Sequence, residues 1–525
     1  MPEKLPEKAV EKLPEKMVEK LPEKVIENLP EKVLEKLPQQ RQIPIARTLS
    51  LVAKMRQELA RELKGGSRIE REASSARGKE IRSALKRREL GEWGVKPDRA
   101  DKVQLIFDDE KSRIQELIPL RHERMAASPF AFYRGSALLM ASDLAEMKTT
   151  GISVQACGDA HLGNFGIFAS QERRLTFDIN DFDETLAAPW DYDVRRLMAS
   201  IEICGRCRGF QESQNETIVR HAAQMYQTSM RGYAGMGNLD VWYDHLDLQK
   251  MLEAPADRFS AESREVLEQA MRKAAGKTRE SAFKKLTEQT DGSIRFRSNP
   301  PVLVPLRDMK GAAAMGITPE QAGRLLTVVL KQYRLSLPKE RRYLVDQYRI
   351  WDVARKVVGV GSVGRRAWVI AMTGADTSDP LILQIKEAGE SCLERYVGRS
   401  AYIEHGRRIV EGQRSIQTTG DILTGWVRIP DAEGGIKDYY VRQLWDEKGA
   451  VSLDSISASD LDGYAAICAR TLAHAHAKTG NRYEIAGYLG KGEAFANAMA
   501  SFARNYADQN EADYQVFLKK IGKSS

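Results

Sequence analysis

Four short β-rich runs stand between long stretches of helical periodicity, and this contrast most constrains what the chain can fold into. The runs are "VARKVVGVGSVGRRAWVIAMTG", "PLILQIKEA", "ILTGWVRI" and "DYYVRQLW", with turn residues between them. Short runs rich in Val, Ile and aromatic residues are typical of a small antiparallel sheet. We therefore expect an α+β fold in which a β-rich lobe is flanked in the sequence by helical segments.

The composition limits the compartment and the partners of the chain. A length of 525 residues is too great for one simple core, so two or three domains or lobes are expected. Five cysteines in a chain of this size indicate a reducing compartment. The sequence contains neither an apolar run long enough to cross a membrane nor an apolar signal core. We expect a cytoplasmic protein with no membrane partner.

The first hundred residues form two segments that we expect to lie outside the chemistry. Residues 1–40 repeat the octapeptide "LPEKMVEK" with small variations, and a proline in each copy prevents a continuous helix. Residues 41–100 predict a basic helical extension, because positions 41–90 hold fourteen Lys and Arg against six Glu, which equals the whole formal charge of +8. No aromatic residue lies among these charges to stack on bases, so nucleic-acid binding is disfavoured against a solvated helix face.

The stretch "CGDAHLGNFG" carries the strongest chemical signal. Asp159 and Asn164 are five residues apart, and Asp181 follows in "INDFDE" after the next apolar run. In kinases an Asp accepts the proton of the substrate hydroxyl, an Asn five residues later holds Mg²⁺, and an Asp-Phe pair holds the metal against the phosphates. The spacing therefore predicts Asp159 as the base and Asn164 and Asp181 as metal ligands. A metallophosphoesterase, suggested by "DAH", is disfavoured because the further histidines of that class are missing.

The stretch "VGVGSVG" predicts a phosphate-binding turn. Gly359, Gly361 and Gly364 have GxGxxG spacing, with Ser362 between them. A dinucleotide-binding fold would need a helix at the third glycine and an acidic residue about twenty positions later. Here a strand-like run follows and leads to Lys386. A Gly-rich hairpin and a strand ending in Ile-Lys favour a kinase small lobe, in which the turn covers the phosphates of ATP and the lysine bridges them.

The remaining small-lobe elements follow in order. The segment "YIEHGRRIVEGQRSIQ" predicts a helix that supplies a glutamate to Lys386, with Glu411 expected and Glu404 as the alternative. The last helical part, "YAAICARTLAHAHAKTG", is typical of the helix that leads into a kinase catalytic loop, yet it comes near the end of the chain. We therefore predict a protein-kinase-like two-lobe fold that is circularly permuted, which is physically tolerable because domain termini often lie close together.

The motifs resemble a bacterial family known as domain of unknown function 2252, which is grouped with the protein-kinase-like superfamily. The resemblance rests on "LRHERMAASPFAFYRG", "CGDAHLGNFGIFAS", "FDINDFDETLAAPWDYDVRRL" and "DYYVRQLWDEKG". The loop "GDAHLGN" is also similar to that of aminoglycoside and choline kinases. The resemblance implies an ATP site with the same residues in the same roles, His161 as a residue that shapes the loop, and a structural role for Asp193. Asp183 stands where protein kinases have the glycine of Asp-Phe-Gly.

Several alternatives stay open at this point. Arg134 in "FAFYRG" is expected either to reach a phosphate or to form a structural ion pair, and Cys204 with Cys207 forms a lone pair that does not predict zinc. The expected activity is Mg²⁺- and ATP-dependent phosphotransfer to an unknown hydroxyl, with a small-molecule acceptor favoured over a protein. Transfer of AMP and a nucleotide-binding pseudokinase are the alternatives.

The expected segments are an arm (1–40), a basic extension (41–100), a large lobe (101–345), a small lobe (346–450) and helices that complete the large lobe (451–525).

Overall fold

The computed structural model describes most of the chain from residue 70 onward. The described ranges are 70–94, 101–253, 261–290, 292–309, 319–357, 359–430, 435–444 and 449–523. The octapeptide arm and the first part of the basic extension, residues 41–69, lie outside them. The rest of the extension begins with helix α6 (Arg71–Ala84), whose Arg77 forms an ion pair of 3.0 Å with Glu484 of α23 (Arg482–Leu489).

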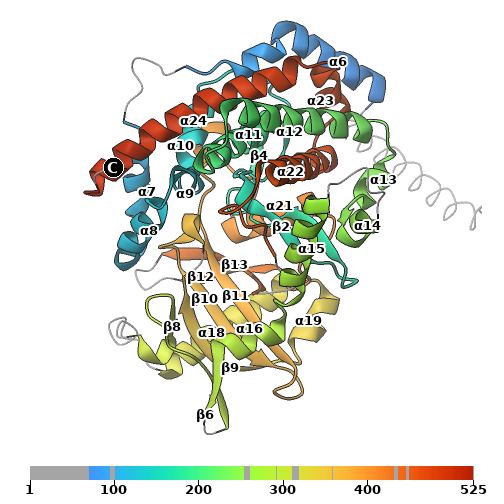
Figure 1. The fold of residues 1–525 in the computed structure, drawn as a ribbon. Helices are drawn as coiled ribbons and strands as arrows, with labels where there is room; N and C mark the ends of the chain where they lie inside the picture. Colours follow the sequence, from blue (N-terminus) through green and yellow to red (C-terminus); the bar gives the residue numbers. More distant parts are fainter. Residues whose placement is uncertain are drawn as a thin grey trace, which may run out of the picture. The chain divides into compact units, whose positions relative to one another are not determined.

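The helical part of the molecule is built around four long helices. They are α11 (Trp190–Cys207), α12 (Glu212–Tyr233), α22 (Ala458–Thr479) and α24 (Ala494–Lys520), which Figure 1 shows grouped above the large sheet. Every residue of α11 from Trp190 to Gly205 is buried, so this helix is the centre of the group. The ring of Trp190 stacks on Tyr226 of α12 with centroids 5.5 Å apart. The core of these helices includes Trp190 and Tyr226, which precede the sheet in the chain, and Leu472 and Phe495, which follow it.

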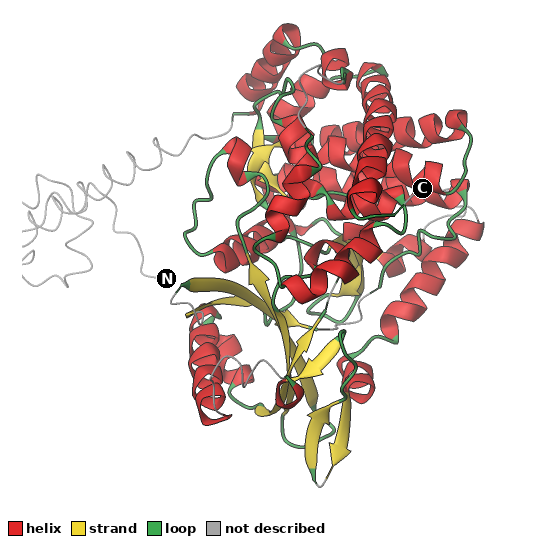
Figure 2. Ribbon diagram, turned by 90° about the vertical axis from the view of Figure 1, so that its left-hand side faces the viewer, coloured by secondary structure: helices red, strands yellow, loops and turns green. Residues whose placement is uncertain are grey.

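The predicted antiparallel sheet is confirmed. It has six strands in the order β12-β13-β11-β10-β9-β8, and all neighbouring strands are antiparallel. Figure 2 shows these strands gathered below the helices. The bounds are Gly425–Pro430, Ile436–Gln443, Pro380–Ala388, Ala367–Thr373, Arg349–Lys356 and Leu303–Pro305, in the same order. The protein is thus a mixed α+β structure with several antiparallel sheets.

The two faces of the sheet are covered by different elements of the chain. Ile370 and Met372 of β10 share a core with Tyr333 of α18 (Pro319–Ser336), whereas Val369 and Ala371 share a different core with Phe296 of β7 (Ser293–Phe296). This alternation follows from the period of two along a strand. The covering elements also include α16 (Arg279–Leu286) and α19 (Lys339–Val345), whereas β6 (Thr287–Thr290) pairs with β7 in a separate two-stranded sheet.

These contacts move the expected lobe boundary. The sequence places residues up to 345 in the large lobe, but the elements from α16 to α19 pack on the six-stranded sheet. The reason is that helical periodicity shows which face of α18 is apolar, not which of two cores this face joins. Residues 104–144 form four short α-helices: α7, α8, α9 and α10 span Gln104–Glu110, Ile118–Met125, Pro129–Gly135 and Ala137–Leu144.

Two small ladders hold the two loops that carry Asp159, Asn164 and Asp181. In the first, β1 (Ser153–Ala156) pairs with β4 (Leu186–Pro189), and in the second β2 (Phe165–Ala169) pairs with β3 (Leu175–Ile179). Ala156 lies opposite Leu186, and Phe165 lies opposite Ile179. The loops 157–164 and 180–185 therefore start and end side by side, as the predicted convergence of two loops requires.

None of the helices that the structure describes is long and apolar enough to span a membrane.

Candidate functional site

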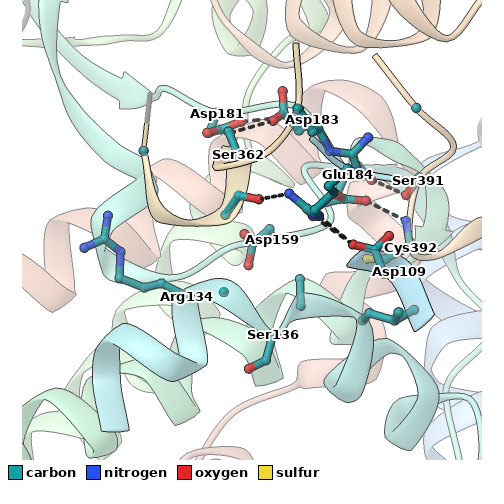
Figure 3. Close-up of a pocket in the computed structure, with 18 of the residues that line it drawn as sticks. Asp109, Arg134, Ser136, Asp159, Asp181, Asp183, Glu184, Ser362, Ser391 and Cys392 are labelled. Carbon is teal, nitrogen blue, oxygen red and sulfur yellow. Dashed lines mark hydrogen bonds and ion pairs between the residues drawn. The ribbon is translucent and has the colours of Figure 1, made fainter. Parts of the chain in front are cut away.

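A cavity of about 410 Å³ lies where the two loops meet the six-stranded sheet (Figure 3). This volume is within the range of about 300–1,000 Å³ that is typical of small-molecule sites. Residues predicted for the site line it from four segments: Asp159, His161, Asn164, Asp181, Gly359, Gly361, Ser362 and Lys386. Gly364 and Glu411, which the structure also describes, are not among the lining residues.

Asp159 is fixed by a buried arginine that the sequence analysis did not single out. Its Oδ1 accepts a hydrogen bond of 2.8 Å from Nε of Arg196, while Nη2 of Arg196 donates to the carbonyl of Tyr133 at 2.7 Å. The guanidinium also lies 3.7 Å from the centre of the Tyr133 ring. Burial raises the pKa of Asp159 above its ordinary value, and the charge of Arg196 opposes this rise. The result is an oriented carboxylate that binds a proton more readily than an exposed aspartate.

His161 and Asn164 complete the first loop. Nδ1 of His161 accepts a hydrogen bond of 3.0 Å from the backbone N–H of Gly163, and burial lowers the pKa of the ring well below its usual value. Nδ2 of Asn164 donates to the carbonyl of Asp159 at 2.9 Å. The backbone carbonyl of Asn164 accepts from Asn180 at 2.8 Å, which ties the first loop to the second.

The glycine at 158 is required by the backbone. Its φ is +83°, and a Cβ at this position would lie 2.1 Å from the carbonyl oxygen of Glu184. Gly158 N–H and Cys157 N–H both donate to the carboxylate of Asp193, at 3.0 and 2.8 Å. Asp193 is buried, and its other contact is Nε2 of His476 at 3.3 Å. Asp193 thus has the structural position that the resemblance implies.

Lys386 is paired with Asp183 rather than with a glutamate of the following helix. Nζ of Lys386 donates a hydrogen bond to Oδ2 of Asp183. Tyr440 lies opposite Lys386 in the β11–β13 pair, and its hydroxyl donates to Oδ1 of Asp183 at 3.0 Å. Oγ of Ser362 also donates to Oδ2 at 3.4 Å. Burial opposes ionisation of Asp183, but the charge and hydrogen bond of Lys386 outweigh it and lower the pKa to about 2. Asp183 is therefore a fixed anion inside the cavity.

The expected pair of Lys386 with Glu411 is not found. Glu411 lies on α21 (His405–Ile416), and its carboxylate is 3.5 Å from Arg414 on the same helix. The alternative, Glu404, precedes that helix and is also absent from the residues that line the cavity. Helix α21 instead directs Arg408 to the second loop, where Nη1 donates to the carbonyl of Thr185 at 2.6 Å and Nη2 to that of Asp183 at 2.8 Å. The sequence predicts the helix but not its rotation, which decides between neighbouring residues.

The Gly-rich segment forms a turn between β9 and β10, with a short 3-10 helix at Val360–Ser362. The carbonyl of Gly361 accepts hydrogen bonds from Arg113 at 2.9 Å and from Arg121 at 3.3 Å. Gly364 has a φ of +89°, and a Cβ there would lie 2.9 Å from Cβ of Arg113. The backbone and the close approach of Arg113 therefore explain the third glycine.

The oxygen atoms of Asn164 and Asp181 suit a hard cation such as Mg²⁺. Oδ1 of Asn164 accepts no hydrogen bond from the described residues, and Oδ1 of Asp181 accepts one of 3.2 Å from Asp183 N–H. Burial and the charge of Asp183 raise the pKa of Asp181, whereas a cation bound to its carboxylate would lower it. Mg²⁺ is commonly held by one or two protein ligands together with substrate phosphates and water. Within the described ranges, no group of three or more His, Cys, Asp or Glu side chains is arranged to hold a metal. Cys204 and Cys207 therefore do not belong to such a group.

The chain belongs to the family of uncharacterized proteins conserved in bacteria, DUF2252, whose model matches residues 113–520. The family resemblance expected from the motifs is therefore confirmed, and the match includes the first loop, the second loop and the strand of Lys386. Comparison with curated proteins and with solved structures gives no match.

Proposed function

We propose that the protein is a kinase-like phosphotransferase that acts in the cytoplasm, uses ATP with Mg²⁺ and phosphorylates the hydroxyl group of a small molecule. The observation that carries this proposal is the shared cavity, in which Asp159, Asn164 and Asp181 meet Gly361 and Lys386. Asp183 and Lys386, which contact each other there, are 203 residues apart in the sequence. This contact brings the second loop and the strand of Lys386 to the same cavity.

The topology of the sheet supports a kinase-like two-lobe fold. The Gly-rich turn joins β9 to β10, and Lys386 lies on β11, the third strand of this antiparallel series. Kinases have the same order of a Gly-rich loop followed by a lysine on the third strand. In this chain the catalytic loop precedes the sheet, and the helix α22, whose His476 supports Asp193, follows it. The proposed fold is therefore circularly permuted relative to a kinase.

The residues of the chain account for the steps of phosphotransfer. Asp159, oriented by Arg196, accepts the proton of the acceptor hydroxyl as the acceptor oxygen bonds to the γ-phosphorus. The bond from this phosphorus to the bridging oxygen breaks, and its electron pair leaves with ADP. Lys386 neutralises the phosphates of the nucleotide beneath the Gly-rich turn. Mg²⁺, which Asn164 and Asp181 would hold, supplies neutralisation of the phosphate charge.

The experiment is a transfer assay with ATP labelled either at the γ- or at the α-phosphate, using a mixture of small hydroxyl metabolites and the purified chain. The proposal expects the γ-label in a small product and much slower transfer by Asp159→Asn, about 10²- to 10⁴-fold, while nucleotide binding by this variant is retained. Transfer of the α-label would establish AMP transfer in its place. Nucleotide binding without transfer of either label by the parent would favour a pseudokinase.

A further inference from the structure

Arg134 stands between the Gly-rich turn and the catalytic loop. It lies in the last turn of α9, and its carbonyl oxygen is 3.4 Å from the position that a Cβ on Gly361 would occupy. Its Nε is 3.3 Å from the corresponding position on Gly163. The side chain therefore extends from beneath the turn toward the loop of Asp159. Figure 3 shows Arg134 below the loop that bears Ser362, with its side chain running to the left of Asp159 in this view.

The guanidinium of Arg134 has no hydrogen bond or ion pair within the described ranges, although its charge opposes the rise that burial causes in the pKa of nearby Asp159. Its Nε is buried without a hydrogen bond, although the residue lines the cavity. The neighbouring arginines of the same wall are paired: Arg113 with Asp109 at 2.8 Å and Arg121 with Glu110 at 3.0 Å. The structural ion pair considered for Arg134 is therefore not found. Buried donors are almost always satisfied, so an unpaired cation in a polar cavity indicates an anionic ligand.

The position of the guanidinium selects the anion. If the Gly-rich turn covers the phosphates and Asp159 receives the proton of the acceptor, the phosphoryl group that moves lies between them. Arg134 occupies this interval, and a guanidinium matches phosphate oxygens with two parallel donors. We propose that Arg134 binds the oxygens of the transferred γ-phosphoryl group, an inference that rests on the proposed function.

In this step the negative charge on the γ-phosphoryl oxygens is neutralised while the bond to the bridging oxygen breaks and the bond to the acceptor oxygen forms. Electrostatic stabilisation of this kind is strong inside a cavity from which water is excluded. Arg134 contributes no proton, since an arginine stays charged at all ordinary pH values.

The test compares a triphosphate with a diphosphate. Affinities of the full chain for the slowly hydrolysed imido analogue of ATP and for ADP are measured by calorimetry with Mg²⁺. Arg134→Gln is expected to weaken triphosphate binding about tenfold or more and to leave ADP binding within about twofold. Arg134→Lys keeps the charge but not the paired donors, so it is expected to retain part of the parent's triphosphate affinity that Arg134→Gln loses. Arg399→Gln, at an exposed arginine that does not line the cavity, is the matched control and is expected to change neither affinity.

Two results would overturn the inference. Equal losses for both nucleotides would make Arg134 a structural residue. Unchanged affinities for both would assign it to another anion, such as a charged group of the acceptor. These outcomes differ from failure of the proposed function itself, in which the parent chain binds neither nucleotide.

Discussion

The two walls of the cavity hold their aspartates in opposite ways. On the wall formed by the helical part, Asp159 pairs with Arg196, and burial raises its pKa. On the wall that faces the sheet, Asp183 pairs with Lys386, and its pKa falls to about 2. The first carboxylate is oriented and ready to accept a proton, while the second is a permanent counter-charge that positions a lysine. One cavity thus contains a group suited to proton transfer and a group suited to binding.

The largest expected effect comes from removing the proton acceptor. Asp159→Asn keeps the size of the side chain but cannot accept the proton, so turnover is expected to fall about 10²- to 10⁴-fold. Nucleotide affinity should change little, because this residue lies on the acceptor side of the cavity. Initial rates and calorimetric titration of the same preparation provide the comparison. A variant with full turnover would remove Asp159 from the mechanism.

The second effect comes from breaking the pair on the sheet wall. Lys386→Met removes the cation that is proposed to bind phosphates, so nucleotide affinity is expected to fall about 10- to 100-fold. It also leaves Asp183 without its partner, and the free energy of unfolding should fall by about 3 kcal/mol.

The double variant Lys386→Met with Asp183→Asn serves as its control. It is expected to regain most of the lost stability but none of the nucleotide affinity, because both charges are removed together. If the single variant is as stable as the parent in urea denaturation, the buried pair contributes nothing and this part of the account fails.

A third prediction uses pH to separate the two aspartates. The pKa of Asp183 is lower in the folded chain than the ordinary value of 3.8, so its pair stabilises the fold above that value. This stability, about 2 kcal/mol, should be lost as pH falls from about 4 toward 2. Asp183→Asn should flatten this part of the stability curve, whereas Asp159→Asn should not. A curve that both substitutions flatten equally would contradict the assigned difference.

The smallest effect is expected at the glutamate that the sequence suggested. Glu411→Gln should change turnover and nucleotide affinity by less than about twofold, because its carboxylate contacts Arg414 outside the cavity. Arg408→Gln is the informative companion, since it removes donors to the carbonyls of Asp183 and Thr185. Calorimetry on both variants would show which side chain of α21 supports the lysine pair. A large loss in Glu411→Gln would restore the expected lysine–glutamate pair in the nucleotide-bound protein.

The local parts of the site could be predicted from the sequence. Asp159, Asn164 and Asp181 belong to two loops held by short ladders between neighbouring strands, so their motifs are close both in sequence and in space. The Gly-rich turn and Lys386 were recognisable because a hairpin and its next strand are also local. That the Gly-rich turn and Lys386 lie beside the two loops could be proposed only because phosphotransfer needs these residue types in one site.

The long-range partners could not be predicted in the same way. Arg196 reaches Asp159 because α11 is buried with one particular rotation, and Tyr440 reaches Asp183 because of the register of β13 on β11. Helical periodicity does not specify the rotation of α11, and strand composition does not specify the register of β13 on β11. The same limit explains why Arg408 was missed and why α18 was assigned to the wrong core.

The most direct test of the central claim, that two distant segments form one nucleotide site, is a thermal-shift titration with ATP in the presence and absence of Mg²⁺. It is applied to the parent chain, to Asp181→Asn and to Lys386→Met. A ligand that binds only the folded state raises its stability by about 2.7 kcal/mol at a concentration one hundred times its Kd. The account predicts a Mg²⁺-dependent shift in the parent that both substitutions weaken. A parent chain that shows no shift at any ATP concentration would contradict it.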